Sequence, residues 1–129
     1  MIEIGAAITR DIKVDDGRAI SFMGPDLRVY STPSILLDIE FACRDLLLPM
    51  LDEGQDSVGS HVSLDHVEAA VLGGTATVAA NISKLEKRRV TFEVTVSAGQ
   101  REIARAMHVR TIVAVADLKT RIAQLSPEE

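Results

Sequence analysis

The chain has 129 residues, of which 47% are apolar and only 3% aromatic, and its formal net charge is −5. This length suits one domain over residues 1–129, with a core of aliphatic rather than aromatic side chains. The negative charge argues against binding to the nucleic-acid backbone, and the shortage of aromatic side chains argues against stacking on single-stranded bases.

The sequence also indicates a compartment. Cys43 is the only cysteine, so no disulfide can form within the chain, which favours a reducing environment. Residues 1–8 lack the basic start and apolar stretch of a signal peptide. Four charged side chains interrupt the apolar segment Ile35–Leu51, so we expect a core helix and not a membrane span. The sequence therefore predicts a cytoplasmic protein that does not bind membranes.

The first elements are a strand and a helix. Alternation predicts a strand over Ile4–Val14, with Arg18–Met23 as a short hairpin partner. Thr32 and Pro33 then form a helix-start signal, because threonine can cap a helix and proline suits its first turn. This helix is apolar over most of its circumference and ends near Pro49, so we expect it to be largely buried.

The rest of the chain shows period-two alternation, followed by a short terminal helix over Asp117–Leu125. Turn signals separate the segments, which predicts four consecutive strands joined by hairpins. These strands are Ser57–Val67, Thr75–Ile82, Val90–Val96 and Glu102–Val113.

This element order predicts an α+β protein with an antiparallel sheet. A lone helix that is apolar nearly all round needs a sheet that wraps around it, which is the hotdog architecture. Because an exposed sheet edge is usually paired or covered, we expect two chains to join edge to edge as a homodimer. The sequence leaves open whether such dimers pair further into tetramers.

Glu40 is the most informative polar residue. On a helical wheel Ser34, Asp38 and Asp45 form a polar stripe, whereas Glu40 points almost the other way, among apolar side chains. A carboxylate there is costly unless it is paired or its charge is tuned. Two interpretations remain open: an ion pair with Arg44 one turn on, or a carboxylate that lines a buried pocket.

Two further residues could work with Glu40. His66 shares a strand face with Val62 and Leu64, so it points towards the helix, where it could exchange protons or simply pack. Thr32 could serve only as the helix cap, or it could help to hold an anion at the helix N-terminus.

The other polar residues give weaker indications of function. His61 lies on the opposite face from His66, Cys43 is expected in the core, and the side of the sheet that His108 and Arg110 face cannot be decided. The basic run at residues 84–89 is expected to be a solvated hairpin turn, with contact to the phosphates of a large anionic cofactor as the alternative. The sequence has no HxxxH, CxxC, Gly-x-Ser-x-Gly or phosphate-binding glycine motif.

Several segments together resemble a known family. Residues 30–43 (YSTPSILLDIEFAC) resemble the central-helix signature of the fluoroacetyl-CoA thioesterase type of hotdog proteins, with Thr32 and Glu40 at the family's positions. Residues 49–66 are similar to its Pro…Gly…(Ser/Thr)-x-Gly-Thr…His block. In this match Gly59 falls on the family's glycine position and His66 on its catalytic histidine. Arg88-Arg89 and residues 106–110 (AMHVR) resemble its Arg-Arg turn and its Gly-Thr-His-Glu-Arg stretch, and the similarity extends over roughly residues 4–118.

The resemblance implies an acyl-CoA thioesterase with its pocket at a dimer interface. Glu40 would act on the thioester carbonyl as nucleophile or base, His66 would activate water and protonate the leaving thiolate, and Thr32 would position the carboxylate or the oxyanion. Gly59 and Arg110 would bind substrate. No metal is implied, and no cofactor apart from the CoA of the substrate.

The chain also departs from the family pattern. The loop Gly24–Val29 is shorter than in the fluoroacetyl-CoA enzyme and lacks its aromatic residues, so we do not expect fluoroacetate specificity. Glu68 is acidic where the family has a small residue, and is expected either at a solvated strand end or facing the pocket.

Two other functions remain. A hydratase or dehydratase of the same fold would usually carry an Asp-x-Asn-x-x-His pattern, which is absent here. A non-catalytic acyl-CoA-binding module is the second alternative, because a shared fold does not ensure a shared activity.

Overall fold

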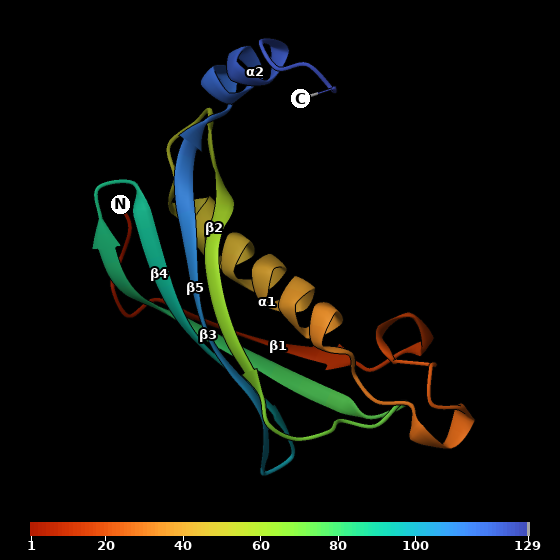
Figure 1. Cartoon of the computed structure of the whole chain (residues 1–129). Coiled ribbons are helices and arrows are strands. Elements are labelled where there is room, and N and C mark those ends of the chain that lie inside the picture. Colours follow the sequence, from red (N-terminus) through yellow and green to blue (C-terminus); the bar gives the residue numbers. More distant parts are fainter. Residues whose placement is uncertain (129) are drawn as a thin grey trace.

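The computed structural model describes residues 1–128, in which a curved antiparallel sheet wraps around one side of a long helix, α1 (Thr32–Leu47) (Figure 1). A second helix, α2 (Val115–Ala123), follows the last strand and projects beyond the sheet. No helix in this part of the chain is long and apolar enough to cross a membrane. The strands of the sheet are β1 (Ala7–Lys13), β2 (Gln55–His66), β3 (Thr75–Glu86), β4 (Arg89–Ala98) and β5 (Arg101–Ala114).

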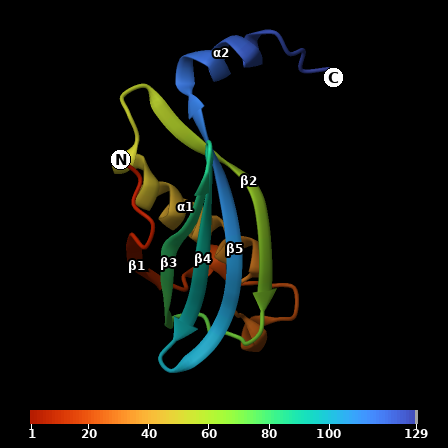
Figure 2. The same cartoon turned by 90° about the vertical axis from the view of Figure 1, so that its left-hand side faces the viewer.

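The strand order is β1-β3-β4-β5-β2, so β2 lies at the edge of the sheet (Figure 2). The hairpins β3–β4 and β4–β5 are confirmed, with Lys87 and Gly99 at positive φ in their turns. The predicted hairpin between β2 and β3 is wrong, because β2 pairs with β5 and residues 67–74 cross to the other half of the sheet. Alternation locates a strand in the sequence, but it does not say which strand is its neighbour.

The core lies between one face of α1 and the concave face of the sheet. Cys43 is fully buried there, as predicted, and this burial raises the pKa of its thiol to about 12, so that it stays protonated. The buried aliphatic side chains each contribute roughly 1.5–3 kcal/mol relative to exposure. The largest fully buried hydrophobic side chains are those of Tyr30, Phe92, Ile35, Ile39, Leu47, Ile82 and Ile103.

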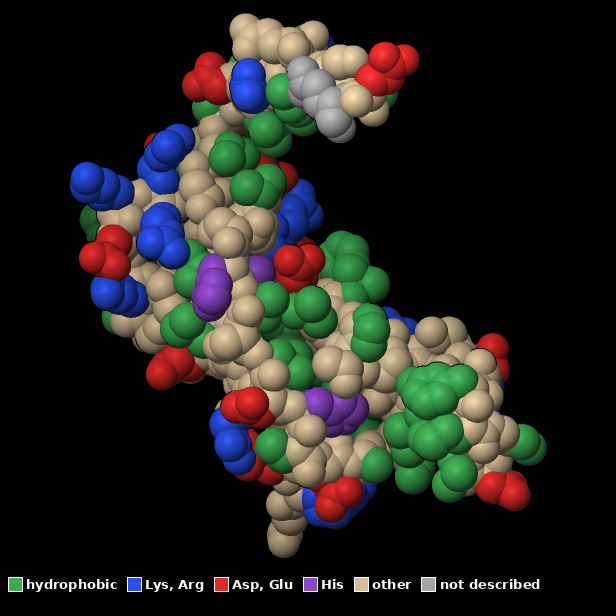
Figure 3. All heavy atoms as spheres, viewed as in Figure 1, with side chains coloured by type: hydrophobic (Ala, Val, Ile, Leu, Met, Phe, Trp, Pro, Cys, Tyr) green, Lys and Arg blue, Asp and Glu red, His purple; other side chains and the backbone are tan. Residues whose placement is uncertain are grey.

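Another face of α1 is not covered by any of residues 1–128. Leu37 and Phe41 are 52% and 53% exposed, so the helix is less buried than its composition predicts. Exposed hydrophobic side chains also gather over the segment before α1, where Phe22, Met23 and Leu27 lie (Figure 3). The helix has thus two apolar faces, of which only one packs on its own sheet.

The cap of α1 is Ser31 and not Thr32. Ser31 has extended backbone angles, and its Oγ accepts a hydrogen bond from the Ser34 N–H at 3.1 Å. Thr32 is already the first helical residue, followed by Pro33. The sequence prediction of Thr32 as the cap is therefore wrong by one residue, and the Thr32 hydroxyl is available for a different partner.

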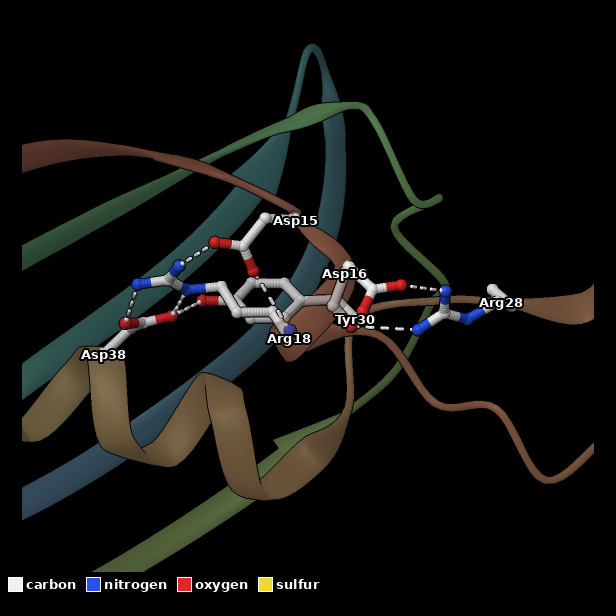
Figure 4. A network of polar contacts seen from close by, with 6 residues as sticks. All are labelled: Asp15, Asp16, Arg18, Arg28, Tyr30 and Asp38. Atoms are coloured by element: carbon white, nitrogen blue, oxygen red, sulfur yellow. Dashed lines mark hydrogen bonds and ion pairs between the residues drawn. The ribbon is translucent and has the colours of Figure 1, made fainter.

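The segment before α1 is fixed by a polar network (Figure 4). Residues 18–23 form no strand; only Ala19 makes an isolated bridge, with Tyr30. Arg18 instead donates two hydrogen bonds to Asp38 on α1, at 2.8 and 3.0 Å, and the Tyr30 hydroxyl also donates to Asp38. Asp38 is 6% exposed, so the polar stripe predicted for α1 includes a buried, fully engaged carboxylate.

Electrostatics reinforce this network. The hydrogen bond from Arg18 to Asp38 raises the pKa of Arg18. Burial, together with the same carboxylate, raises the pKa of the Tyr30 hydroxyl. Both groups therefore keep their protons at neutral pH. Beyond Arg18, Arg28 pairs with Asp16 and donates to the carbonyl oxygens of Asp16 and Ala19, which joins the two ends of the loop before the helix.

Candidate active site

The Thr32 hydroxyl lies against His66. Its Oγ1 is 2.7 Å from His66 Nδ1, which joins the first turn of α1 to the last residue of β2. His66 faces the helix with Val62 and Leu64, as the alternation predicts, and His61 and Asp65 are exposed on the other face. The hydrogen bond fixes the imidazole ring and directs Nε2 away from Thr32.

Glu40 lies farther along α1, over Gly59 of β2. A Cβ at position 59 would be 2.5 Å from Glu40 Oε1 and 3.2 Å from His108 Cε1, so a side chain there would displace one of these groups. Glu40 is half-buried, and within residues 1–128 its carboxylate forms no hydrogen bond or ion pair. Because glycine has no side chain, position 59 leaves room for the Glu40 carboxylate.

The ion pair between Glu40 and Arg44, one of the two interpretations of the sequence, is wrong. Arg44 forms a bidentate ion pair with Asp56 on β2, in which Nε donates to Oδ1 at 3.0 Å and Nη2 donates to Oδ2 at 2.6 Å. This hydrogen bonding raises the pKa of Arg44 and lowers that of Asp56. Glu40 instead lines a small cavity of about 70 Å³ with Leu37, Phe41, Arg44 and Arg110.

Arg110 and His108 project from β5 to the helix side of the sheet, where the sequence could not place them. Arg110 donates from Nε to Ser57 Oγ at 2.7 Å and from Nη2 to the Ser57 carbonyl oxygen at 2.9 Å. Arg110 Nη1 is 3.1 Å from His108 Nε2, and His108 Nδ1 is 2.9 Å from the His61 carbonyl oxygen. Sequence reasoning missed Ser57, because only the pairing of β2 with β5 brings it beside Arg110.

The chain therefore holds two polar centres, Thr32–His66 and Glu40–Gly59. Thr32 and Glu40 are eight residues apart on α1, which is about 12 Å along the helix axis. On β2, Gly59 precedes His66 by seven residues, a distance on the order of 20 Å along an extended strand. The structure brings Thr32 to His66 and Glu40 to Gly59, but it does not bring Glu40 to His66 within one chain.

Two peripheral predictions are confirmed. The basic run covers the end of β3, the β3–β4 turn and the start of β4. Lys84 pairs with Glu86 at 2.9 Å within β3, and Figure 3 shows Lys and Arg side chains gathered on that side of the molecule. Glu68 is exposed just beyond β2, where its carboxylate accepts a hydrogen bond from the Ala69 N–H. Glu68 is therefore at a solvated strand end.

Comparison with known proteins places this geometry in a family. The family model described as fluoroacetyl-CoA-specific thioesterase matches residues 14–116. The chain belongs to this family. Its central helix, Gly59 and both polar centres all lie within the matched residues, and the chain is accordingly a thioester hydrolase.

Individual relatives agree with this assignment. The fluoroacetyl-CoA thioesterase of Streptantibioticus cattleyicolor is 25% identical over 133 residues, covering 98% of this chain and 96% of the relative. A solved structure of the fluoroacetyl-CoA thioesterase FlK superposes with a TM-score of 0.87 at 25% identity, over 98% of this chain and 99% of the other. A hot-dog-like protein from Thermanaerovibrio acidaminovorans also gives a TM-score of 0.87, at 22% identity and over 94% and 90% of the two chains. The hotdog fold expected from the sequence is thus confirmed.

Proposed function

We propose that this thioesterase hydrolyses an acyl-CoA to the free acid and CoA, at a pocket built by two subunits from Thr32, Glu40 and His66. The observation that carries the proposal is the 2.7 Å contact between Thr32 and His66 on the fold of a thioesterase family. A solved structure of a mutant of FlK in complex with fluoroacetate and CoA supports a CoA thioester as the substrate class.

His66 is suited to proton transfer. When Nδ1–H donates to Thr32 Oγ1, Nε2 is unprotonated and can take a proton from water, then return it to the departing CoA thiolate. The Thr32 hydroxyl can accept this hydrogen bond, so the contact is compatible with the tautomer that hydrolysis requires. The role of Thr32 at the site is thus to orient the histidine.

Glu40 supplies a carboxylate that is not engaged elsewhere. As a nucleophile it would attack the thioester carbonyl carbon, form a mixed anhydride and release CoA thiolate, and water would then hydrolyse the anhydride. As a base it would take a proton from the water that attacks the carbonyl directly. Both routes require the carboxylate near the carbonyl carbon and an acid near the leaving sulfur.

One chain cannot bring these groups to the same thioester. A reacting carbonyl needs its partners within about 3–3.5 Å, whereas Glu40 and the Thr32–His66 pair are separated by about 12 Å along α1. A second subunit, related by a two-fold axis, removes this difficulty. Glu40 of one subunit would then face His66 of the partner subunit.

The edge strand β2 offers the surface for this dimer. Among the described residues no strand pairs with its outer side, and the exposed Leu37 and Phe41 lie on the helix that it borders. Antiparallel pairing of two β2 strands centred on Val62 and Ser63 would put Gly59 opposite His66 of the partner subunit. That register would bring the Glu40 carboxylate, which lies over Gly59, beside the partner's histidine.

The test is thiol release from a panel of short-chain, medium-chain and aryl acyl-CoAs by the wild type and His66→Ala. We expect hydrolysis that falls at least ~10²-fold in this variant, the scale of a general acid–base group. His61→Ala is the matched control, because this side chain is exposed on the opposite face of the same strand. Saturable acyl-CoA binding without any hydrolysis would instead support the non-catalytic binding module.

A further inference from the structure

We propose that helix α2 of one subunit docks, through an apolar stripe, on an exposed apolar patch of the partner subunit and so covers one side of the pocket that the two subunits share. This inference rests on the proposed function, because it uses the antiparallel β2–β2 dimer proposed there. It gives a role to two exposed surfaces at opposite ends of the chain.

The first surface is the apolar stripe on α2 and the turn after it. Its members are three or four residues apart, so a helix presents them along one face. Three of them are between 43% and 57% exposed, whereas Leu118 is half-buried and lines a cavity with Ile112 at the base of the helix. The stripe consists of Val115, Leu118, Ile122 and Leu125.

This helix lacks the contacts that usually stabilise a short helix. It has nine residues, and within residues 1–128 none of them is buried and no side chain caps its N-terminus. Isolated helices shorter than about 12–15 residues are marginal in water, and most helices in proteins depend on packing of their apolar face. We therefore expect the stripe to pack against a surface outside its own chain.

The second surface, which we call the loop patch, joins the segment before α1 to the segment after β2. The two segments are held together by the bridge between Val29 and Val71 and by the Leu72 N–H, which donates to the Arg28 carbonyl oxygen at 3.1 Å. Hydrophobic side chains gather over this part of the molecule (Figure 3). The side chains of the loop patch are 38–79% exposed and are those of Phe22, Met23, Leu27, Val71 and Leu72.

The stripe and the loop patch cannot meet within one chain, because α2 and the segment before α1 lie at opposite ends of the sheet (Figures 1 and 2). A two-fold axis through β2 removes this separation. The Val115 N–H donates to the Gly54 carbonyl oxygen at 2.9 Å, which ties α2 to the start of β2, whereas residues 67–72 follow its end at His66. In an antiparallel pair the start of one strand lies beside the end of the other, so α2 would lie beside the partner's loop patch.

The charges around the two surfaces are complementary. On a helical wheel Lys119 and Arg121 lie on either side of the stripe, and both are exposed. The loop patch has the exposed carboxylates of Asp26, between Met23 and Leu27, and of Glu68, just before Val71. Within residues 1–128 none of these four charged side chains forms an ion pair. A second copy of this chain therefore fits the stripe in both its apolar and its charged groups.

Docking would bring α2 to the shared pocket. In the proposed dimer Glu40 of one subunit works with His66 of the partner subunit, and both lie towards the end of the interface where α2 of the first subunit begins. Each α2 would thus cover the pocket to which its own subunit contributes Glu40. Because a cover of this kind holds substrate without touching the reacting atoms, its loss should raise KM and leave kcat nearly unchanged.

Cross-linking tests the docking directly. Chains that carry both Ile122→Cys and Phe22→Cys are treated with a short bismaleimide, and we expect a covalent dimer on a denaturing gel. The matched control carries Thr120→Cys in place of Ile122→Cys, because Thr120 lies on the opposite face of α2, and should cross-link much more slowly. Each single-cysteine variant is a further control, and the native Cys43 is fully buried and should not react.

Ile122→Asp tests the cover, with Thr120→Asp as its control on the same helix. Burial of one isoleucine corresponds to a tenfold or larger change in affinity, so we expect the dissociation constant of the dimer to rise by at least ~10-fold. At protein concentrations where the dimer persists, KM for the best acyl-CoA of the panel should rise by about tenfold. Phe22→Asp should have the same effects from the other side of the contact.

The outcomes separate this inference from the proposed function. Cross-links that form within one chain, that are equally fast in the Thr120 control, or that do not form at all overturn the docking and leave the thioesterase proposal standing. An unchanged KM in Ile122→Asp overturns the cover. A wild type that forms the expected cross-link but hydrolyses no member of the panel overturns the proposed function and supports the docking.

Discussion

Asp38 and Glu40 lie two residues apart on the central helix and are in opposite situations. Asp38 is 6% exposed and accepts hydrogen bonds from Arg18 and from the Tyr30 hydroxyl, so its oxygens are occupied in holding the segment before α1 (Figure 4). Glu40 is half-buried and lines a cavity with Arg110, and within residues 1–128 nothing donates a hydrogen bond to it.

The difference shows how one helix can separate structure from chemistry. A carboxylate whose oxygens are all engaged stabilises the fold but cannot easily accept a proton or attack a carbonyl carbon. A carboxylate that is held in place without being hydrogen-bonded retains that capacity. Replacing the carboxylate by an amide should therefore lower the stability of the fold at Asp38 and the turnover of the enzyme at Glu40.

The largest effect is expected from Glu40→Gln. We expect turnover to fall at least ~10²-fold because the amide can neither attack the carbonyl nor take a proton. The free energy of unfolding should change little, since the carboxylate has no hydrogen bond to lose. Thiol release and urea unfolding of the same preparation measure both, and full activity with intact substrate binding would show that Glu40 is not the reactive carboxylate.

The converse effect is expected from Asp38→Asn. It should lower the free energy of unfolding by about 2–3 kcal/mol, at the low end for breaking a buried ion pair because the Arg18 side chain is 34% exposed. Asp45→Asn on the same helix is the matched control; its pair with Arg10 is at the surface, where such pairs contribute about 0–1 kcal/mol. Equal unfolding energies for the two variants would contradict a structural role for Asp38.

Tyr30→Phe should weaken the same network by a smaller amount. It removes one hydrogen bond to Asp38 and leaves the ring in place, so we expect a loss of about 1 kcal/mol in unfolding free energy. The turnover of the folded variant should stay near that of the wild type. A larger loss of turnover than of stability would mean that the Asp38 side of the helix also takes part in the chemistry.

The smallest expected effect is a pH dependence on the Glu40 side. Burial lowers the pKa of His108 from its ordinary 6.5, so the unfolded chain binds this proton more readily than the folded one. Stability is therefore complete above about pH 6.5 and falls as the pH drops from there towards the lowered pKa. Unfolding at about pH 7.5 and about pH 5.5 should show a shallower decrease for His108→Gln than for the wild type, and identical decreases would contradict a buried neutral His108.

The sequence predicts some of these features because they follow from local chemistry. Alternation locates every strand of the sheet, and the apolar pattern around Glu40 marks it as unusual on its helix. The face of His66 follows from period two along β2. These features need only the spacing of residues within one element.

Other features could not be predicted because they depend on which elements are neighbours. The pairing of β2 with β5 brings Ser57 to Arg110, and nothing in either strand specifies that pairing. The helical wheel put Asp38 in a polar stripe because the wheel does not include Arg18, which comes from the preceding loop. The shift of the cap from Thr32 to Ser31 depends on backbone angles at a single residue.

The central claim is that Glu40 of one subunit works with His66 of the partner subunit, and mixed dimers test it most directly. Glu40→Gln and His66→Ala chains, each nearly inactive alone, are unfolded together in equal amounts, refolded, and assayed for thiol release. Sites shared between subunits predict recovery to about a quarter of wild-type activity, because about half of the dimers are mixed and each of these holds one intact site. Mixed dimers that form and remain as inactive as the separate variants would show that each chain works with its own Glu40 and His66, and would contradict the account.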